Sequence, residues 1–192
     1  PIYKYKIINQ MIAPSELIIN PDGSCFHLHL KPEQLADKII MVGDPDRVNT
    51  VASYFDTKEC EVSSREFHTI TGTYKGKRIT TLSHGIGTDN IDIVLNELDA
   101  LANIDFASRT IKPEFRQLTM VRVGTSGGLQ PFVPVGTYVA AGKSIGFDGV
   151  LYFYAGSEEV RDKAFESELI RQLEWKLNDI KPYVVSADPS LG

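Results

Sequence analysis

The stretch that decides the fold class is KIIMVGDPDRV, residues 38–48. Its first part is a short apolar run that stops at Gly43, which is typical of a buried strand followed by a tight turn. Proline is favoured at the first position of a helix, so we expect Pro45 to open a helix that extends to about Phe55, with Asp44 as its N-cap. A strand, a tight turn and a helix in succession predict the start of an α/β unit.

Strand and helix signals alternate along the rest of the chain. The turn residues 75–77 (KGK) separate two β-type segments, 66–74 and 78–82, and this pattern predicts a hairpin. Helices are expected at 89–103, where one face is apolar, and at 159–177. Further strand-like patterns, the second of them of the buried type, occur at 26–30, 118–123, 134–141 and 183–187. Together these elements predict an α/β fold with a mixed sheet.

Length, composition and charge exclude several classes of protein. With 192 residues, 42% of them hydrophobic and 23% charged, the chain is long enough for one globular domain with its own core. The net charge of −5 argues against a nucleic-acid partner, and no apolar run approaches the roughly 20 residues that span a membrane. The two cysteines, Cys25 and Cys60, are too few for a disulfide framework, which favours a reduced cytoplasmic protein. No secretory signal is recognised, and we expect residues 1–12 to be an extension to the domain.

Three turns with small residues follow predicted strands, and two of them carry an arginine. They are Gly43 to Arg47, Gly85 to Thr88, and Arg122 to Gly128. Glycines at the carboxyl ends of strands let backbone N–H groups approach an anion, and a helix N-terminus attracts negative charge. Arg122 is the single charge of an otherwise apolar strand end, where an arginine needs an anionic partner. Each arginine alone fits a structural salt bridge equally well, but their repeated pairing with glycine turns favours a phosphate site.

The same turns partly match two other motifs. Residues 124–128 fit the G-x-S-x-G nucleophile elbow around Ser126, but the proline-containing segment 130–134 follows where that elbow needs a helix. All four histidines also precede Ser126, which is the wrong order for the triad. Residues 85–90 begin like a dinucleotide fingerprint, but Asn90 replaces its third glycine. A hydrolase is therefore disfavoured, and an NAD-binding oxidoreductase is kept as an alternative.

Cys25, His27 and His29 occur at every second position, with Cys25 directly before the short strand expected at 26–30 and the two histidines on one of its faces. Two histidines on one strand face can ligate a metal, but no third ligand with suitable spacing accompanies them. A polar strand face is the favoured interpretation, and no metal site is predicted.

Five short segments occur in a recognisable order along the chain. They are 26–28 (FHL), 42–48 (VGDPDRV), 64–67 (SREF), 85–87 (GIG) and 122–127 (RVGTSG). Together they resemble the nucleoside phosphorylase-I superfamily, and within it the bacterial uridine phosphorylases. The similarity runs from about residue 13 to the end of the chain. It implies an α/β domain over 13–192 with a mixed, distorted barrel-like central sheet flanked by helices, incomplete at its C-terminal end.

The resemblance also implies a phosphate site made of two segments. Gly43 and Arg47 are similar to the first segment, and Arg122 and Thr125 to the second. Arg122 and Thr125 are then the catalytic residues, with Thr125 also near the ribose. Inorganic phosphate is the co-substrate, and no other cofactor is expected.

Two further residues are implied to act across a subunit interface. Arg65 resembles the arginine that reaches the neighbouring subunit's phosphate, and His27 the histidine that binds the neighbour's ribose. A homodimer that shares its active sites is therefore expected, with three such dimers forming a hexamer.

The activity implied is phosphorolysis of uridine to uracil and ribose 1-phosphate in pyrimidine salvage. The motif that holds the ribose hydroxyls in the family is not found in these 192 residues, so we expect this chain by itself to be inactive. A purine nucleoside phosphorylase or a nucleosidase of the same superfamily is the alternative. From other classes, the NAD-binding oxidoreductase and a non-catalytic nucleoside-binding module are kept.

Overall fold

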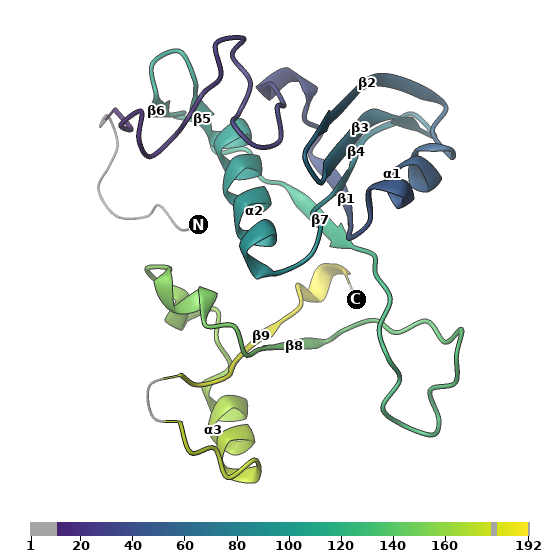
Figure 1. The fold of residues 1–192 in the computed structure, drawn as a ribbon, viewed down its shortest axis with the longest axis vertical. Coiled ribbons are helices and arrows are strands. Elements are labelled where there is room, and N and C mark those ends of the chain that lie inside the picture. The colour runs from purple at the N-terminus through teal and green to yellow at the C-terminus, as the bar shows by residue number, and fades with distance from the viewer. Residues whose placement is uncertain (1–10, 178–179, 192) are drawn as a thin grey trace. The chain divides into compact units, whose positions relative to one another are not determined.

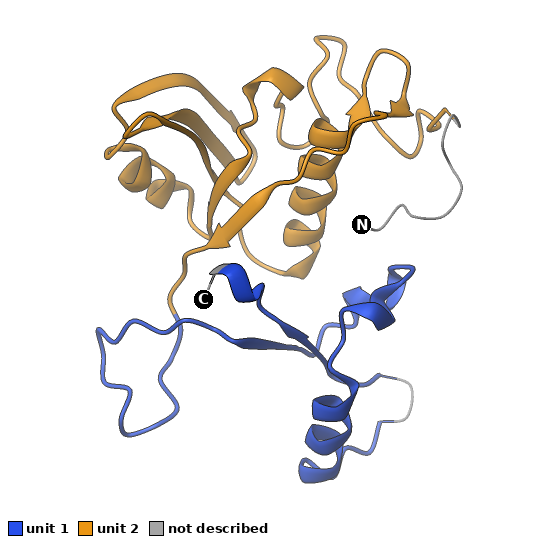
Figure 2. Ribbon diagram, turned by 180° about the vertical axis from the view of Figure 1, so that it is seen from behind, with its two compact units in different colours: residues 1–4, 126–192 blue, residues 5–125 orange. Residues whose placement is uncertain are grey.

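A computed structural model describes residues 11–177 and 180–191 (Figure 1). The chain divides into an N-terminal unit, Tyr5–Thr125, and a C-terminal unit that takes in Ser126–Gly192 (Figure 2). Nearly all of the extension expected over residues 1–12 lies outside the described residues. None of the described helices is long and apolar enough to cross a membrane.

The N-terminal unit is built on a mixed five-stranded sheet. Its described elements are η1 (Pro32–Gln34), β1 (Lys38–Val42), α1 (Pro45–Ala52), β2 (Thr57–Ser64), β3 (Phe67–Tyr74), β4 (Lys77–Ser83), α2 (Thr88–Asn103), β5 (Ile104–Asp105), β6 (Thr110–Ile111) and β7 (Thr119–Arg122). The strand order is β2-β3-β4-β1-β7, with β1 parallel to both β4 and β7. Strand β3 is antiparallel to β2 and β4, while β5 and β6 pair separately. The predicted α/β class with a mixed sheet is confirmed.

Local signals account for the first strand–turn–helix unit. Pro45 occupies the first turn of α1, and the Asp44 carboxylate caps the helix by accepting from the Asp46 backbone N–H at 2.9 Å. The helix ends at Ala52, earlier than the sequence predicts. The β3–β4 hairpin is also confirmed, and its turn residues Lys75 and Gly76 have φ values of 49° and 73°. Positive φ at both positions is the type I′ geometry that matches the twist of paired strands.

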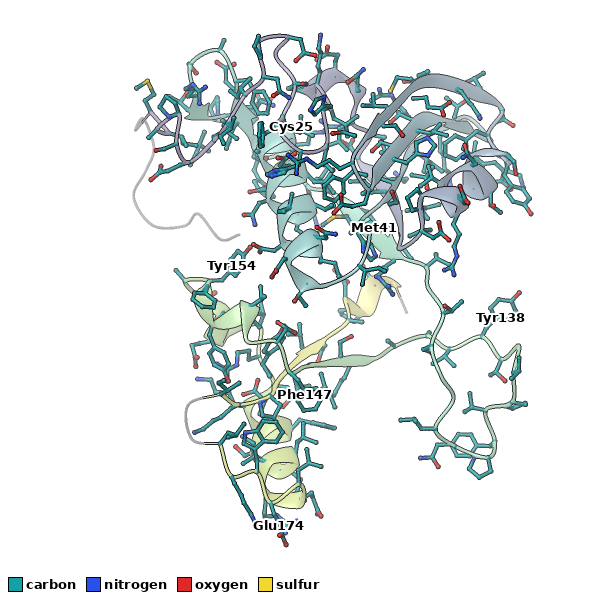
Figure 3. The ribbon with its side chains drawn as sticks, in the orientation of Figure 1. Cys25, Met41, Tyr138, Phe147, Tyr154 and Glu174 are labelled. Carbon is teal, nitrogen blue, oxygen red and sulfur yellow. The ribbon has the colours of Figure 1, made fainter. Side chains whose placement is uncertain are left out.

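The two helices of this unit cover opposite faces of the sheet (Figure 1). Alternate residues of β1 point to opposite sides, so Met41 packs in the core cluster that contains Leu98 of α2, whereas Val42 packs with Val48 of α1. Cys25 belongs to the same core cluster as Met41, and Figure 3 labels both side chains. This two-sided burial fixes the register of β1 and therefore the place where its carboxyl end emerges.

The strand expected at 26–30 is wrong, because these residues form a turn that follows a single bridge between Cys25 and Ile19. The backbone N–H groups of His27 and Leu28 both donate to the carboxylate of Glu97, at 2.9 Å each. A buried side chain on α2 therefore takes the hydrogen bonds that a neighbouring strand would otherwise receive.

Strand β7 was expected to be buried, and this expectation is also wrong. Its four residues are exposed, because β7 is an edge of the sheet and the described residues place no further strand beside it. It still pairs in parallel with β1, so its last residue, Arg122, lies opposite Met41.

The C-terminal unit contains less regular structure. Its described elements are β8 (Lys143–Gly146), η2 (Val150–Phe153), η3 (Ser157–Glu159), α3 (Lys163–Gln172), β9 (Tyr183–Ser186) and η4 (Pro189–Leu191). Strands β8 and β9 are antiparallel, and β9 lies where a strand was predicted. The strand expected at 134–141 is wrong, since Pro134 instead opens a turn in which Gly136 has a φ of 91°. The expected helix over 159–177 is too long at both ends, because Asp162 caps α3 and Glu174 adopts a φ of 47°.

Candidate functional site

The carboxyl ends of β1, β4 and β7 border an open cavity of about 650 Å³, here called the strand-end cavity. The cavity is lined by the segments that follow these strands, by the first turns of α1 and α2 and by the last residue of β7: Gly43, Asp44, Pro45, Arg47, His84, Gly85, Ile86, Gly87, Thr88, Ile91, Arg122, Gly124 and Thr125. They include four of the five predicted phosphate-binding residues, namely Gly43, Arg47, Arg122 and Thr125. All lie within the N-terminal unit.

The first predicted segment combines a glycine with a helix N-terminus. Gly43 directly follows β1, and Arg47 lies in the first turn of α1, where backbone N–H groups and the helix dipole favour an anion. A methyl group added at Gly43 would meet only ordinary contacts, at 3.8 Å from the Gly85 carbonyl oxygen and 3.9 Å from His84 Cε1. Packing therefore does not require a glycine here, and the missing side chain leaves the backbone open to close approach by a ligand.

The second segment presents a guanidinium with a fixed orientation. Arg122 Nε donates to Nε2 of His84 at 2.9 Å. A Cβ atom at Gly124 would come within 2.5 Å of Arg122 Nη1, so the guanidinium lies directly over that glycine. Among the described residues, no carboxylate forms an ion pair with Arg122 or with Arg47. The structural salt bridge that the sequence left open is thus absent from the described part of the chain, and both cations face the cavity unpaired.

His84 is a cavity residue that the sequence interpretation missed. Its side chain is buried, with only 2% of the residue exposed. Burial lowers the pKa of the imidazole, and the positive charge of Arg122 lowers it further. Its position in the sequence could have identified it as a site residue, since His84 directly follows β4 and precedes Gly85 in a glycine turn.

The turn between β4 and α2 has the strand–turn–helix layout that a dinucleotide fingerprint requires, but the Asn90 side chain lies inside it. Gly85 and Gly87 have φ values of 66° and 94°. Asn90 Nδ2 donates to Glu66 Oε1 at 2.9 Å and to the Ile86 carbonyl at 3.1 Å. Where the fingerprint has its third glycine, this chain therefore has an amide that ties the turn to β2–β3.

His27 and Arg65 do not line the strand-end cavity. His27 Nδ1 lies 2.7 Å from Glu97 Oε1, and its ring makes an edge contact with Phe26 at 4.8 Å. The Arg65 guanidinium lies 5.9 Å from the centre of the same Phe26 ring, and Arg65 holds a φ of 54° in the β2–β3 turn. The two residues predicted to serve a neighbouring subunit thus both lie against Phe26, with His27 half-buried and Arg65 exposed, and their roles stay predictions.

Within the described residues, no group of three or more histidine, cysteine or acidic side chains is arranged to hold a metal ion. Cys25 is buried, and burial raises the pKa of its thiol. In the described residues no helix follows the turn that contains Ser126, so the geometry of a nucleophile elbow is not formed there.

Comparisons with known proteins give one family. The phosphorylase superfamily matches residues 37–187. The uridine phosphorylase of Haemophilus influenzae is 31% identical over 168 residues, which are 85% of this chain and 61% of that protein. The DeoD-type purine nucleoside phosphorylase of Levilactobacillus brevis is 37% identical over 116 residues, which are 60% of this chain and 44% of that protein.

A solved structure supports the same assignment. A Trypanosoma brucei nucleoside phosphorylase with uridine phosphorylase activity superposes with a TM-score of 0.78 at 34% identity, covering 91% of this chain and 59% of that one. The chain thus spans between 44% and 61% of the length of these relatives. Because the family match extends over most of its residues, the chain belongs to the phosphorylase superfamily.

Proposed function

We propose that the protein cleaves a nucleoside with inorganic phosphate, and that uridine is the substrate. A phosphate oxygen bonds to C1′ of the ribose while the bond from C1′ to N1 of uracil breaks. The proton of the hydrogen phosphate ends on the departing base, so the products are uracil and ribose 1-phosphate. Phosphate is the co-substrate, and the reaction needs no other cofactor.

The observation that carries this proposal is the pair of arginines without carboxylate partners in the strand-end cavity. Arg47 and Arg122 both line it, and neither forms an ion pair within the described part of the chain. A guanidinium presents a fork of donors that suits the oxygens of a phosphate. Gly43 adds backbone that an anion can approach closely.

These groups accelerate the reaction by position and charge rather than by covalent attack. Phosphate is itself the nucleophile, so the protein needs to hold it beside C1′ in a productive orientation. Negative charge held next to the sugar also stabilises the positive charge that develops on the ribose as the base leaves. This division of roles gives Arg122 and Thr125 the catalytic contacts with phosphate.

We propose a homodimer in which each subunit lends His27 and Arg65 to the other's site, and three such dimers in a hexamer. The support is positional, since neither residue lines the cavity of its own chain. Arg65 also keeps an unfavourable positive φ on an exposed turn, which suits a residue that is used elsewhere.

The substrate is tested by assaying the full-length protein with uridine and inosine side by side, each with and without phosphate. The proposal expects phosphate-dependent release of uracil. Release of hypoxanthine from inosine instead supports the purine alternative. The similarity to DeoD-type purine nucleoside phosphorylases favours that alternative. Equal release without phosphate would identify a nucleosidase and overturn the proposal.

The site is tested with Arg122→Ala in the same protein. Loss of charged hydrogen bonds to phosphate raises the phosphate KM on the order of tenfold to a hundredfold. Arg171→Ala is the matched control, because Arg171 is an exposed arginine of α3 that pairs with Glu168. An unchanged phosphate KM in Arg122→Ala contradicts the assignment of the site.

A further inference from the structure

His84 is the most buried polar side chain of the strand-end cavity, and it touches the arginine assigned to phosphate. Its backbone N–H donates to the Val42 carbonyl at 2.9 Å, which anchors the residue to the end of β1. Its Nε2 atom then accepts from Arg122 Nε at 2.9 Å. The main chain of His84 is therefore held by β1 and its ring by the guanidinium, while its buried Nδ1 has no hydrogen-bond partner among the described residues.

The strand order explains how these two side chains meet. His84 follows β4 and Arg122 ends β7, so β1 lies between them. Neighbouring strands are about 4.8 Å apart, so the side chains must reach across about 10 Å. Gly124 leaves room for the guanidinium, since a Cβ atom there would lie 2.5 Å from Arg122 Nη1. Gly124 is thus the glycine that the contact between His84 and Arg122 requires.

The direction of this hydrogen bond fixes the state of both groups. Arginine Nε always carries hydrogen, so the imidazole accepts at Nε2 and is neutral, with its proton on Nδ1. Since Nε is engaged by His84, the terminal nitrogens Nη1 and Nη2 remain as the pair of donors for an anion. A protonated imidazole has no lone pair at Nε2 and would add a second cation beside the guanidinium.

We propose that His84 is a positioning residue that holds Arg122 with its two terminal nitrogens toward phosphate. The inference rests on the proposed function in so far as phosphate is the ligand. Burial and the charge of Arg122 lower the pKa of His84, which keeps the ring neutral at pH 7. Below that lowered pKa the ring is protonated, the hydrogen bond breaks, and phosphate affinity falls.

Other charged groups lie near His84 and Arg122 and can also affect how phosphate binding changes with pH. Asp44 and Arg47 line the same cavity from the start of α1. Glu66 approaches from the β2–β3 turn, since a Cβ on Gly85 would lie 2.8 Å from its Cγ. The difference between wild type and a His84 variant isolates the imidazole, because these groups and phosphate are present in both.

The test compares His84→Gln with His84→Leu in the full-length protein, by isothermal titration with inorganic phosphate between pH 5 and 8. Glutamine keeps an oxygen that can accept from Arg122 Nε and does not titrate in this range, whereas leucine keeps only bulk. We expect the Leu variant to bind phosphate about tenfold more weakly at pH 7.5, and the Gln variant to recover most of that loss. As the pH falls through the lowered pKa of His84, the phosphate affinity of wild type decreases relative to that of the Gln variant.

His68→Gln is the matched control, because the imidazole of His68 pairs with Glu61 on the β2–β3 hairpin and does not line the cavity. Its phosphate affinity stays at the wild-type value. Unchanged binding in His84→Leu, or equal losses in the Leu and Gln variants, overturns the proposal. Wild type that binds phosphate but releases no base overturns the proposed function alone, and wild type that binds no phosphate overturns both.

Discussion

Replacing Glu97 by glutamine should lower the free energy of unfolding of the N-terminal unit, although it hardly changes the shape of the side chain. Glu97 is 9% exposed, and its carboxylate accepts from the His27 and Leu28 backbone N–H groups at 2.9 Å. It also lies 2.7 Å from His27 Nδ1. One carboxylate on α2 therefore satisfies the turn that replaces the expected strand at 26–30.

Glu97→Gln keeps the volume but leaves one oxygen where there were two, and its new NH₂ group faces backbone donors. At about 1.5–3 kcal/mol for each hydrogen bond to a buried charged group, the loss is about 3 kcal/mol once the remaining oxygen keeps one partner. For a chain of this size that corresponds to a fall of roughly 6–12 °C in the unfolding midpoint.

Thermal and urea unfolding followed by circular dichroism measure the effect directly. Glu61→Gln is the control, because Glu61 also contacts a histidine ring, at 3.1 Å, but its side chain is 55% exposed. Exposed pairs of this kind contribute little, so the control should unfold with wild type. A Glu97→Gln midpoint equal to wild type would refute the argument that this carboxylate holds the 26–28 turn.

Two further outcomes follow from contacts in the same unit. Gly43→Ala should weaken phosphate binding on the order of tenfold in titration calorimetry and leave the urea midpoint unchanged, because the added methyl meets only ordinary contacts in the protein but blocks the approach of an anion; unaltered affinity would show that phosphate does not approach this backbone. Cys25 should react with Ellman's reagent only after unfolding, since burial raises the pKa of its thiol, while the half-buried Cys60 reacts in the native protein. If both thiols reacted at the same rate in the native state, that difference in burial would be contradicted.

The sequence predicted best those helices and turns that depend on residues close to each other along the chain. Asp44 and Pro45 define the start of α1, and the turn at Lys75 and Gly76 defines the β3–β4 hairpin. Each depends on residues within a few positions, where capping and turn chemistry act. The boundaries of β1 and β3 followed from the same punctuation.

The failures share a different cause. The alternation at 26–30 is genuine, but its hydrogen bonds go to Glu97, about 70 positions along the chain. The strand expected at 134–141 fails because Pro134 accepts from the Thr137 backbone N–H in a turn. A periodic pattern describes which faces are apolar, and it does not say which group will accept a backbone hydrogen bond.

The candidate site divides in the same way. Gly43, Arg47 and Arg122 stand out in the sequence because a glycine turn with an arginine is unusual at a strand end. His84 does not, because its role depends on a strand order, β4-β1-β7, that brings it across Gly43 to Arg122. Topology, rather than composition, makes it a member of the cavity.

A chain of net charge −5 can still bind an anion, because anion binding depends on the charges close to the site rather than on the net charge. Screening in physiological salt acts over about 8 Å, so acidic groups elsewhere on the surface contribute little inside the cavity. The one carboxylate that lines it, Asp44, is engaged in capping α1 through the Asp46 backbone N–H. Arg47 and Arg122 therefore meet no competing carboxylate among the described residues, and their charge is available to a ligand. For Arg47 and Arg122, the absence of a carboxylate partner among the described residues therefore indicates an anion site more directly than the net charge of the chain argues against one.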